Sequence, residues 1–253
     1  MMTKTFKADK LTVNVYDTRK NMGIAAAAAI ASCIKDLLKV KPEIYIIFAA
    51  APSQNEMLEA LVSDKEIEWN RIHALHMDEY VNLPADAPQG FGNFLRRAIF
   101  DRVPFASVEL IGTDADSEAA CRRYNSILEK NIVDIVCLGI GENGHIAFND
   151  PHVADFNDPL RIKKVDLDNK CRQQQVNDGC FETIEQVPTH ALTLTVPTLF
   201  NVQNAFCVVP TAAKAEAIRK TVMGPIDESC PASILRTHNN VILYIDTDSA
   251  SLL

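Results

Sequence analysis

Short apolar runs rich in β-branched residues alternate along this chain with segments of helical hydrophobic periodicity. The apolar runs lie at Thr12–Tyr16, Ile44–Ala49, Ile72–Leu75, Val108–Ile111, Ile132–Leu138, Ala205–Val209 and Val241–Ile245. The helical segments lie at Met22–Leu38, Glu56–Val62, Phe91–Phe100, Ser117–Lys130 and Ala212–Met223. Because strands that alternate with helices build βαβ units, the sequence predicts an α/β fold with a doubly wound, mostly parallel, Rossmann-like sheet and helices on both faces.

The size of the chain fits one large core. With 253 residues and 47% hydrophobic content, residues 1–253 are expected to form a single domain. One segment interrupts the alternation, because the stretch from His152 to Thr189 is polar and has little apolar periodicity. A long loop inside a compact domain is usually functional, so we expect residues 152–189 to form a lid.

Composition excludes several classes of partner. The formal net charge is −8, acidic and basic residues are mixed, and no basic block occurs, which argues against nucleic acid and anionic membranes. Seven cysteines without a CxxC pair predict reduced thiols in a cytoplasmic protein. The N-terminus has no segment of signal-peptide length, and no run approaches the roughly 20 apolar residues of a membrane span. We therefore expect a soluble protein that acts on a small molecule.

The segment Val133–Pro151 joins a predicted buried strand to a turn with three glycines. Residues 139–144, Gly-Ile-Gly-Glu-Asn-Gly, match the GxGxxG pattern of dinucleotide sites. That pattern requires a helix that begins inside the turn, whereas the sequence Asn149-Asp150-Pro151 stops any helix within about two turns. The match is therefore weak, and we expect no nucleotide cofactor.

The same turn contains a histidine and a carboxylate, His145 and Asp150. A carboxylate partner raises the pKa of a histidine toward working pH, and this pairing is used in general acid/base catalysis. His145 has a structural alternative as a turn residue bonded to the backbone, and Asp150 has one as an Asx-type turn before Pro151. We favour catalysis because a turn after a buried strand is where open α/β sheets bind ligands.

Two further segments follow predicted strands and should lie at the same edge of the sheet. Asp78 follows the strand at Ile72–Leu75, although an acid there is also typical of a solvated loop. Lys214 falls in the first turn of a helix for which Thr211 is the predicted N-cap. A cation in that place opposes the helix dipole at a cost of up to about 1 kcal/mol, which a bound anion would offset. The alternative for Lys214 is a side chain that simply reaches into water.

With these motifs the chain resembles the glucosamine-6-phosphate deaminase/isomerase family, which belongs with the 6-phosphogluconolactonases. The resemblance extends from about Ile44 to Ile245. It is most specific at residues 77–84 (Met-Asp-Glu-Tyr-Val-Asn-Leu-Pro), in the Gly139–Pro151 turn, and at residues 187–193 (Val-Pro-Thr-His-Ala-Leu-Thr). It implies conversion of an aminosugar 6-phosphate, most simply glucosamine 6-phosphate, to a ketose 6-phosphate and ammonia, without redox cofactor or metal. A lactonase-like hydrolase, an isomerase of another sugar and a non-catalytic sugar-phosphate sensor are the alternatives, and a homo-oligomer is left open.

The resemblance also implies roles for four catalytic residues. His145 would assist opening of the pyranose ring, and Asp78 would carry the proton between C2 and C1 of the open chain. Asp150 stands where the family usually has glutamate and would orient His145. Asn143 occupies a position where many members carry an aspartate that helps ring opening, and others an asparagine.

The expected phosphate site departs from the family pattern. Ala49–Asn55 replaces a glycine- and threonine-rich loop, and its Ser53 and Glu56 form a predicted capping box for the following helix. The lid arginine of the family falls near Asp178-Gly179, where the chain has no arginine. We expect substrate or phosphate to be bound by Lys214, Ser53, Gln54, Gly141, Gly144 and Arg172, the last being the nearest basic residue.

Overall fold

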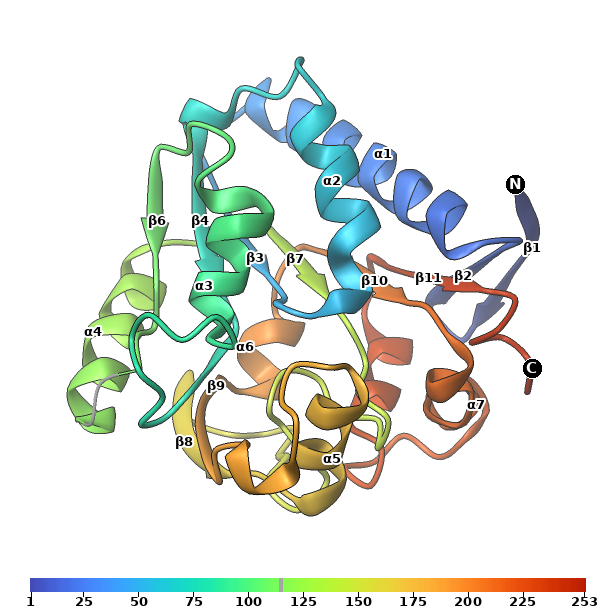
Figure 1. Cartoon of the computed structure of the whole chain (residues 1–253). Helices are drawn as coiled ribbons and strands as arrows, with labels where there is room; N and C mark the ends of the chain where they lie inside the picture. The colour runs from blue at the N-terminus through green and yellow to red at the C-terminus, as the bar shows by residue number, and fades with distance from the viewer. Residues whose placement is uncertain (114–115) are drawn as a thin grey trace.

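The computed structural model describes residues 1–113 and 116–253 (Figure 1). Its larger sheet has the strand order β1-β2-β11-β10-β7-β3-β4-β6. The strands in that order are Met2–Ala8, Leu11–Tyr16, Val241–Asp246, Asn204–Val209, Ile135–Leu138, Ile44–Phe48, Ile72–His76 and Ser107–Glu109. All neighbours pair in parallel except β1, which is antiparallel to β2. The prediction of a doubly wound, mostly parallel sheet is confirmed.

Helices cover both faces of this sheet. The α-helices are α1 (Arg19–Leu38), α2 (Asn55–Ser63), α3 (Phe91–Leu95), α4 (Ser117–Lys130), α5 (Asn169–Asn177), α6 (Val196–Phe200) and α7 (Ala215–Met223). A π-helical turn, η3 (Arg96–Phe100), continues α3. Short 3-10 turns are η1 (Pro52–Gln54), η2 (Trp69–Arg71), η4 (Ile184–Gln186), η5 (Ala212–Lys214) and η6 (Pro231–Thr237).

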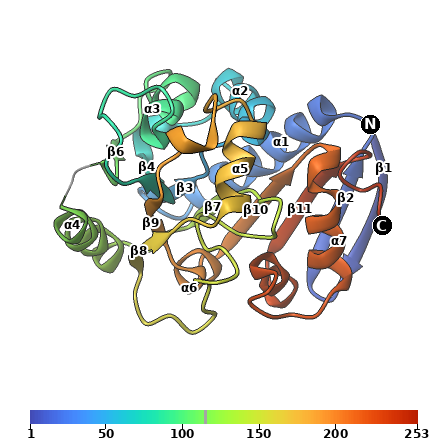
Figure 2. The ribbon, with the colours of Figure 1, turned by 60° about the horizontal axis from the view of Figure 1, so that its bottom comes forward.

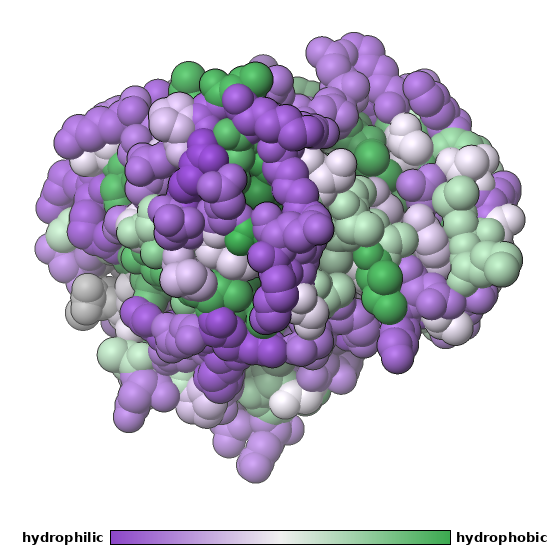
Figure 3. Space-filling model, turned by 90° about the horizontal axis from the view of Figure 1, so that it is seen from above, coloured by the Kyte–Doolittle hydropathy of each residue, from purple (hydrophilic) through white to green (hydrophobic). Residues whose placement is uncertain are grey.

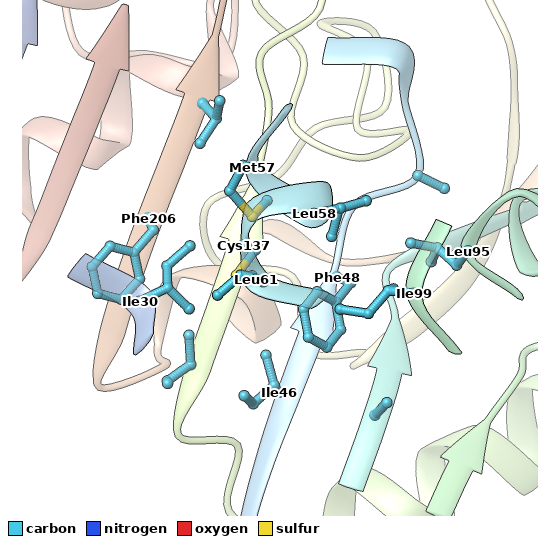
Figure 4. Packing of buried hydrophobic residues seen from close by; sticks show 14 of the residues in the cluster. Ile30, Ile46, Phe48, Met57, Leu58, Leu61, Leu95, Ile99, Cys137 and Phe206 are labelled. Carbon is cyan, nitrogen blue, oxygen red and sulfur yellow. The ribbon is translucent and has the colours of Figure 1, made fainter. Parts of the chain in front are cut away.

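The strands divide their side chains between two hydrophobic clusters because successive residues of a strand point to opposite faces. Ile46 and Phe48 of β3 pack with α1, α2 and α3, and Figure 4 shows this cluster around Phe48, Met57 and Leu61. Ile47 belongs to the cluster on the other face, which contains residues of α4, α6 and α7. A sheet buried on both faces explains why its strands read as continuous apolar runs.

A second sheet, with the order β5-β9-β8, lies beside the first. Its strands are β5 (Asp78–Tyr80), β9 (His190–Leu194) and β8 (Ile162–Asp166), and they pair antiparallel. These strands were not predicted from the sequence. The turn from β4 into β5 carries Asp78 into this second sheet, and Figure 2 shows the sheet and α5 in front of the larger one.

The expectation of an irregular loop over residues 152–189 is wrong, because the segment contains β8, α5 and η4. The inner face of α5 buries Cys171, Gln174 and Gln175. Since two of these three residues are polar, the helix has no apolar periodicity to reveal it. The role of residues 152–189 as a lid stays a prediction.

Helix α1 also departs from expectation. Within its 20 residues, an 18-residue window has a mean hydropathy of 1.3, which is long and apolar enough for a membrane span by length and composition alone, so the expectation that no segment approaches such a span is corrected. Met22, Ala26, Ile30 and Ile34 of α1 are nevertheless buried in the core beside α2, as is usual for the central helix of an α/β domain. The face of the molecule in Figure 3 is mostly hydrophilic, with smaller apolar patches.

Candidate active site

A cavity lies at the carboxyl edge of the larger sheet. Its walls come from segments that follow β2, β3, β4, β7 and β10, together with α5. The titratable side chains that line it are Arg19, Asp78, His145, Asp178 and Lys214. Of the predicted site residues it brings together Ser53, Asp78, Gly141, His145 and Lys214, whereas Gln54, Asn143, Gly144, Asp150 and Arg172 are not part of its lining.

His145 and Asp150 form a pair, with Nδ1 of the imidazole 3.0 Å from Oδ1 of the carboxylate. Asp150 has no exposed surface, and it accepts hydrogen bonds from the Asn143 amide at 2.9 Å and from the backbone N–H of Asp168 at 3.3 Å. Burial opposes ionisation of Asp150, but His145 and these donors outweigh it and hold the pKa of the carboxyl below its usual value. Asp150 thus fixes the imidazole and leaves Nε2 for a substrate.

Asn143 supports this pair from behind the cavity wall. Its Oδ1 accepts the backbone N–H of His145 at 3.1 Å, and its Nδ2 donates to Asp150 and, at 3.1 Å, to Asp168. The side-chain amide of an asparagine is not an acid or base at ordinary pH. Asn143 therefore positions the turn and the Asp150 carboxylate, and direct participation in ring opening is not supported by its place.

Gly141 and Gly144, the two glycines predicted to bind substrate, make different contacts. A Cβ at Gly141 would lie 2.1 Å from Cε1 of His145, so only glycine leaves room for the ring. Gly144 has a φ of +88°, and a Cβ there would lie 2.7 Å from Sγ of Cys230. Gly141 therefore lines the cavity beside the imidazole, while Gly144 lies against Cys230 and its predicted role in substrate binding is not supported.

Asp78 is the other proton-transfer candidate. It is 6% exposed, and burial, together with the neighbouring Glu79, raises the pKa of its carboxyl well above the usual value. Glu79 has its own structural role, because it accepts the backbone N–H groups of Tyr80, Phe91 and Gly92 at 2.8 to 3.0 Å. A buried carboxyl with a raised pKa beside a cavity is suited to general acid/base work.

Lys214 supplies positive charge to the cavity. It is 6% exposed, and its Nζ has no hydrogen-bond partner among the described residues. Burial lowers the pKa of the ammonium group. Thr211 precedes η5 in the N-cap position that was predicted, but its side chain makes no capping bond; it has a strained φ of +82° and donates its N–H to both carboxylate oxygens of Asp246 at 3.1 Å. The predicted placement of Lys214 at the start of a helix beside the site is found.

The predicted capping box at Ser53 and Glu56 is wrong. Pro52 begins the turn η1, so the helix starts earlier than the box requires. Ser53 Oγ accepts a bond from Gln54 Nε2 at 2.9 Å, and the same amide donates to the carbonyl of Val208 at 3.1 Å. Ser53 faces the cavity, whereas Gln54 is fully buried and ties the loop to β10.

Arg172 does not reach the cavity. Its Nη2 donates to the carbonyls of Ile184 and Val187 at 2.6 and 3.0 Å, which ties α5 to η4. The arginine that lines the cavity is Arg19, which sequence reasoning missed. The signal was present, because Arg19 is a cation directly after the strand Thr12–Tyr16 and in the first turn of a helix, as Lys214 is after its own strand.

Helix α5 adds polar groups that the sequence did not reveal as site residues. Gln174, Gln175 and Asp178 all line the cavity. Gln174 accepts the backbone N–H of Glu142 at 2.8 Å, and donates to Asp178 at 3.3 Å. Asp178 therefore brings a carboxylate to the region where the family resemblance implied an arginine.

Two sets of metal-ligand side chains occur in the described part of the chain. They are His145 with Asp150 and Cys171, and Asp150 with His152 and Asp168. Both sets share Asp150, whose oxygens already accept N–H donors, and burial raises the pKa of the Cys171 thiol well above its usual value, away from the thiolate that binds metals. These donors do not favour a metal centre.

Comparison with known proteins agrees with this geometry. A family model described as glucosamine-6-phosphate isomerases/6-phosphogluconolactonase matches residues 17–243. A glucosamine-6-phosphate deaminase of Bacillus cereus (strain B4264) is 36% identical over 220 residues, 87% of this chain and 82% of the relative. One from Bacillus thuringiensis (strain Al Hakam) is 35% identical over the same shares.

Solved structures give the same result. The structure of a monomeric glucosamine-6-phosphate deaminase matches with a TM-score of 0.87 and 30% identity, over 95% of this chain and 99% of that one. A 6-phosphogluconolactonase from Thermotoga maritima matches with a TM-score of 0.77 and 19% identity, over 94% and 100%, and at this identity it shows the shared fold alone. The resemblance found in the sequence is thus confirmed, and the chain belongs to the family of glucosamine-6-phosphate isomerases and 6-phosphogluconolactonases as an enzyme of its deaminase branch.

Proposed function

We propose that this protein converts glucosamine 6-phosphate and water to fructose 6-phosphate and ammonia, a hydrolytic deamination coupled to an aldose–ketose isomerisation. The observation that carries this proposal is one cavity lined by Asp78, His145 and Lys214, that is, a buried carboxyl, an imidazole beside Asp150 and an ammonium with no hydrogen-bond partner among the described residues. The deaminases among its relatives support the choice of substrate.

The first step opens the sugar ring. The ring oxygen gains a proton while the C1 hydroxyl loses one, and the bond between C1 and the ring oxygen breaks. His145 is suited to this exchange, since Asp150 lies at its Nδ1 and Nε2 is left to take and return a proton at the sugar. Asp150 stays ionised throughout, because its pKa is held below the usual value, largely by His145.

The second step moves a proton along the open chain. The Asp78 carboxylate removes the C2 proton while the C1 oxygen gains one, which gives an enolamine, and Asp78 then returns its proton to C1 while the nitrogen releases one, which gives the imine at C2. Water then adds to C2 and ammonia leaves, so the reaction balances without an oxidant or a metal. The hydrophobic surroundings that raise the pKa of Asp78 also make its carboxylate a stronger base.

Residues 152–189 are proposed as a lid for this site. Gln174 and Gln175 of α5 line the cavity, so movement of this segment would change access to Asp78.

The sugar phosphate is the proposed partner molecule, and the cytoplasm, where such metabolites occur, is the proposed location. A lactone hydrolase is the enzymatic alternative.

A substrate panel tests the function. Purified protein is assayed for ammonia and fructose 6-phosphate with glucosamine 6-phosphate, and in parallel with galactosamine 6-phosphate and 6-phosphogluconolactone. We expect equal amounts of ammonia and fructose 6-phosphate from the first substrate, and at most slow turnover of the other two. Preferential hydrolysis of the lactone, without ammonia release from either aminosugar, would refute the proposal.

A further inference from the structure

Lys214 needs a partner that the described residues do not supply. Its ammonium is more than nine-tenths buried, lines the cavity and makes no hydrogen bond among the described residues. A buried cation without a partner is costly, and burial accordingly lowers its pKa. The arrangement indicates an anion site that a ligand completes.

Arg19 brings a second cation to the same cavity from a different part of the fold. It begins α1, directly after β2, and β2 runs parallel to β11, so α1 starts at the carboxyl edge where the cavity lies. Thr18 caps the helix by accepting the N–H of Asn21 at 3.1 Å, and the first turn contains no acid. Arg19 therefore opposes the dipole of a 20-residue helix, as Lys214 does at η5.

The guanidinium of Arg19 is held from one side. Its Nε donates to Glu56 at 2.8 Å, and its Nη2 donates to the carbonyl of Pro52. An arginine has five N–H donors, so these two bonds leave Nη1 and one hydrogen on Nη2 for a ligand. Its side chain is 32% exposed. The guanidinium is thus fixed in direction yet retains the donors needed for an anion.

Acidic groups near the anion site do not cancel these cations. Glu56 pairs with the Nε of Arg19, and Asp178 accepts from Gln174. Asp178 and Glu142 both act on Lys214 by raising its pKa, but burial dominates and lowers it overall. Neither acid makes a hydrogen bond to the Lys214 ammonium, which is the group that remains to be neutralised.

We propose that Arg19 binds the phosphate group of the substrate together with Lys214. This inference deepens the proposed function, on which it depends for the substrate. It assigns the phosphate arginine to the start of a core helix, while Arg172, the basic residue nearest to the expected lid position, is committed to the carbonyls of Ile184 and Val187. Because α1 is part of the buried core, the phosphate site is formed before any movement of residues 152–189.

Two variants test the proposal, R19Q and R19K. Charge-assisted hydrogen bonds contribute roughly 1.5–3 kcal/mol, so R19Q should raise the KM for glucosamine 6-phosphate by about 10- to 100-fold with kcat changed less than about 3-fold. R19K keeps the charge but loses the forked geometry, and should recover part of that loss. Turnover of unphosphorylated glucosamine should be equally slow in the wild type and in R19Q.

Binding of inorganic phosphate, followed by calorimetry, provides a readout that does not require turnover. R19Q should weaken it by at least about 10-fold, and R219Q, which changes an exposed arginine paired with Glu216, should not. The variant E56Q tests whether the anion is contacted by Arg19 itself or depends on the ion pair between Arg19 and Glu56. Because E56Q keeps the guanidinium, it should bind phosphate within about 3-fold of the wild type if Arg19 contacts the anion directly.

The outcomes separate this inference from the proposed function. Loss of phosphate binding in R19Q, without turnover of glucosamine 6-phosphate by the wild type, would support the anion site and overturn the function. If the wild type turns over the substrate and R19Q keeps the wild-type KM and phosphate affinity, the assignment of Arg19 is overturned. Weaker substrate and phosphate binding in R172Q would strengthen that conclusion. Circular dichroism of each variant excludes misfolding, and R19K keeps the test valid if R19Q does not fold.

Discussion

The substitution G141A probes how the turn places the catalytic histidine. A Cβ at residue 141 would lie 2.1, 2.2 and 2.4 Å from Cε1, Nε2 and Nδ1 of His145, whereas ordinary contact begins near 3.4 Å. The ring must therefore move by more than about 1 Å, and that breaks its approach to Asp150. Gly141 is not among the residues with positive φ, so alanine suits the backbone and the strain falls on the imidazole.

The expected effect is kinetic more than structural. A misplacement of about 1 Å costs on the order of 100-fold in kcat, which corresponds to about 2.7 kcal/mol of transition-state stabilisation. Overpacking should lower the free energy of unfolding by about 1–3 kcal/mol. A coupled assay for fructose 6-phosphate gives kcat, and urea titration gives the stability. KM should change little, because Arg19 and Lys214 are untouched.

Two controls isolate the cause. G139A lies in the same turn, but its Cβ would approach Gln54 Nε2 at 3.2 Å, Ser53 Oγ at 3.6 Å and the Val208 carbonyl at 3.7 Å and not the imidazole, so its effect on kcat should stay within about 3-fold. In an H145A background, G141A should add no further loss, since the two substitutions act on one group. A folded G141A enzyme with wild-type kcat would refute the steric argument, as would an undiminished effect in the H145A background.

Four further predictions come from the buried charges and the strained backbone. Because the folded pKa of Asp78 is raised, its carboxyl contributes stability below its unfolded pKa that is lost as pH rises through the folded pKa. D78N should therefore raise Tm at pH 8 but not at pH 3, and an equal Tm at pH 8 would contradict the burial argument. In the wild type, kcat/KM should fall as pH drops through that raised pKa, and a profile flat down to the usual carboxyl range would count against Asp78 as the base. D178N should lower the KM for the sugar phosphate about 3-fold by removing a carboxylate near Lys214, which initial-rate kinetics would detect, whereas a higher KM would show that Asp178 contacts the substrate favourably. T211G should raise the free energy of unfolding by roughly 1 kcal/mol, measured in urea, because glycine adopts a φ of +82° without strain, and a loss of stability would assign the strain elsewhere.

The sequence predicted the larger sheet well because its interior strands are buried on both faces. All seven predicted runs correspond to strands, from β2 at Leu11–Tyr16 to β11 at Val241–Asp246. The second sheet escaped prediction because β5 is only three residues long and consists of Asp78, Glu79 and Tyr80. Charged residues in a strand are buried there only because a cavity and backbone donors receive them, and local sequence does not report that context.

The site was predictable where chemistry and a strand end coincide, as for Asp78, His145 and Lys214. The site was not predictable where tertiary contacts determine which side chains reach the cavity. Arg172 is close to the expected position in sequence, but two carbonyls of the neighbouring turn hold it. Arg19 lies far from the other site residues along the chain, and only the parallel pairing of β2 with β11 brings its helix to the same edge.

The most direct test of the account compares the wild type with D78N in single turnover on glucosamine 6-phosphate. We predict that the wild type forms fructose 6-phosphate and ammonia in equal amounts, and that D78N forms neither while it binds the substrate within about 3-fold of the wild type, because the change removes a base and little contact area. Product formation by D78N at the wild-type rate would contradict the assignment of Asp78 and with it the central claim.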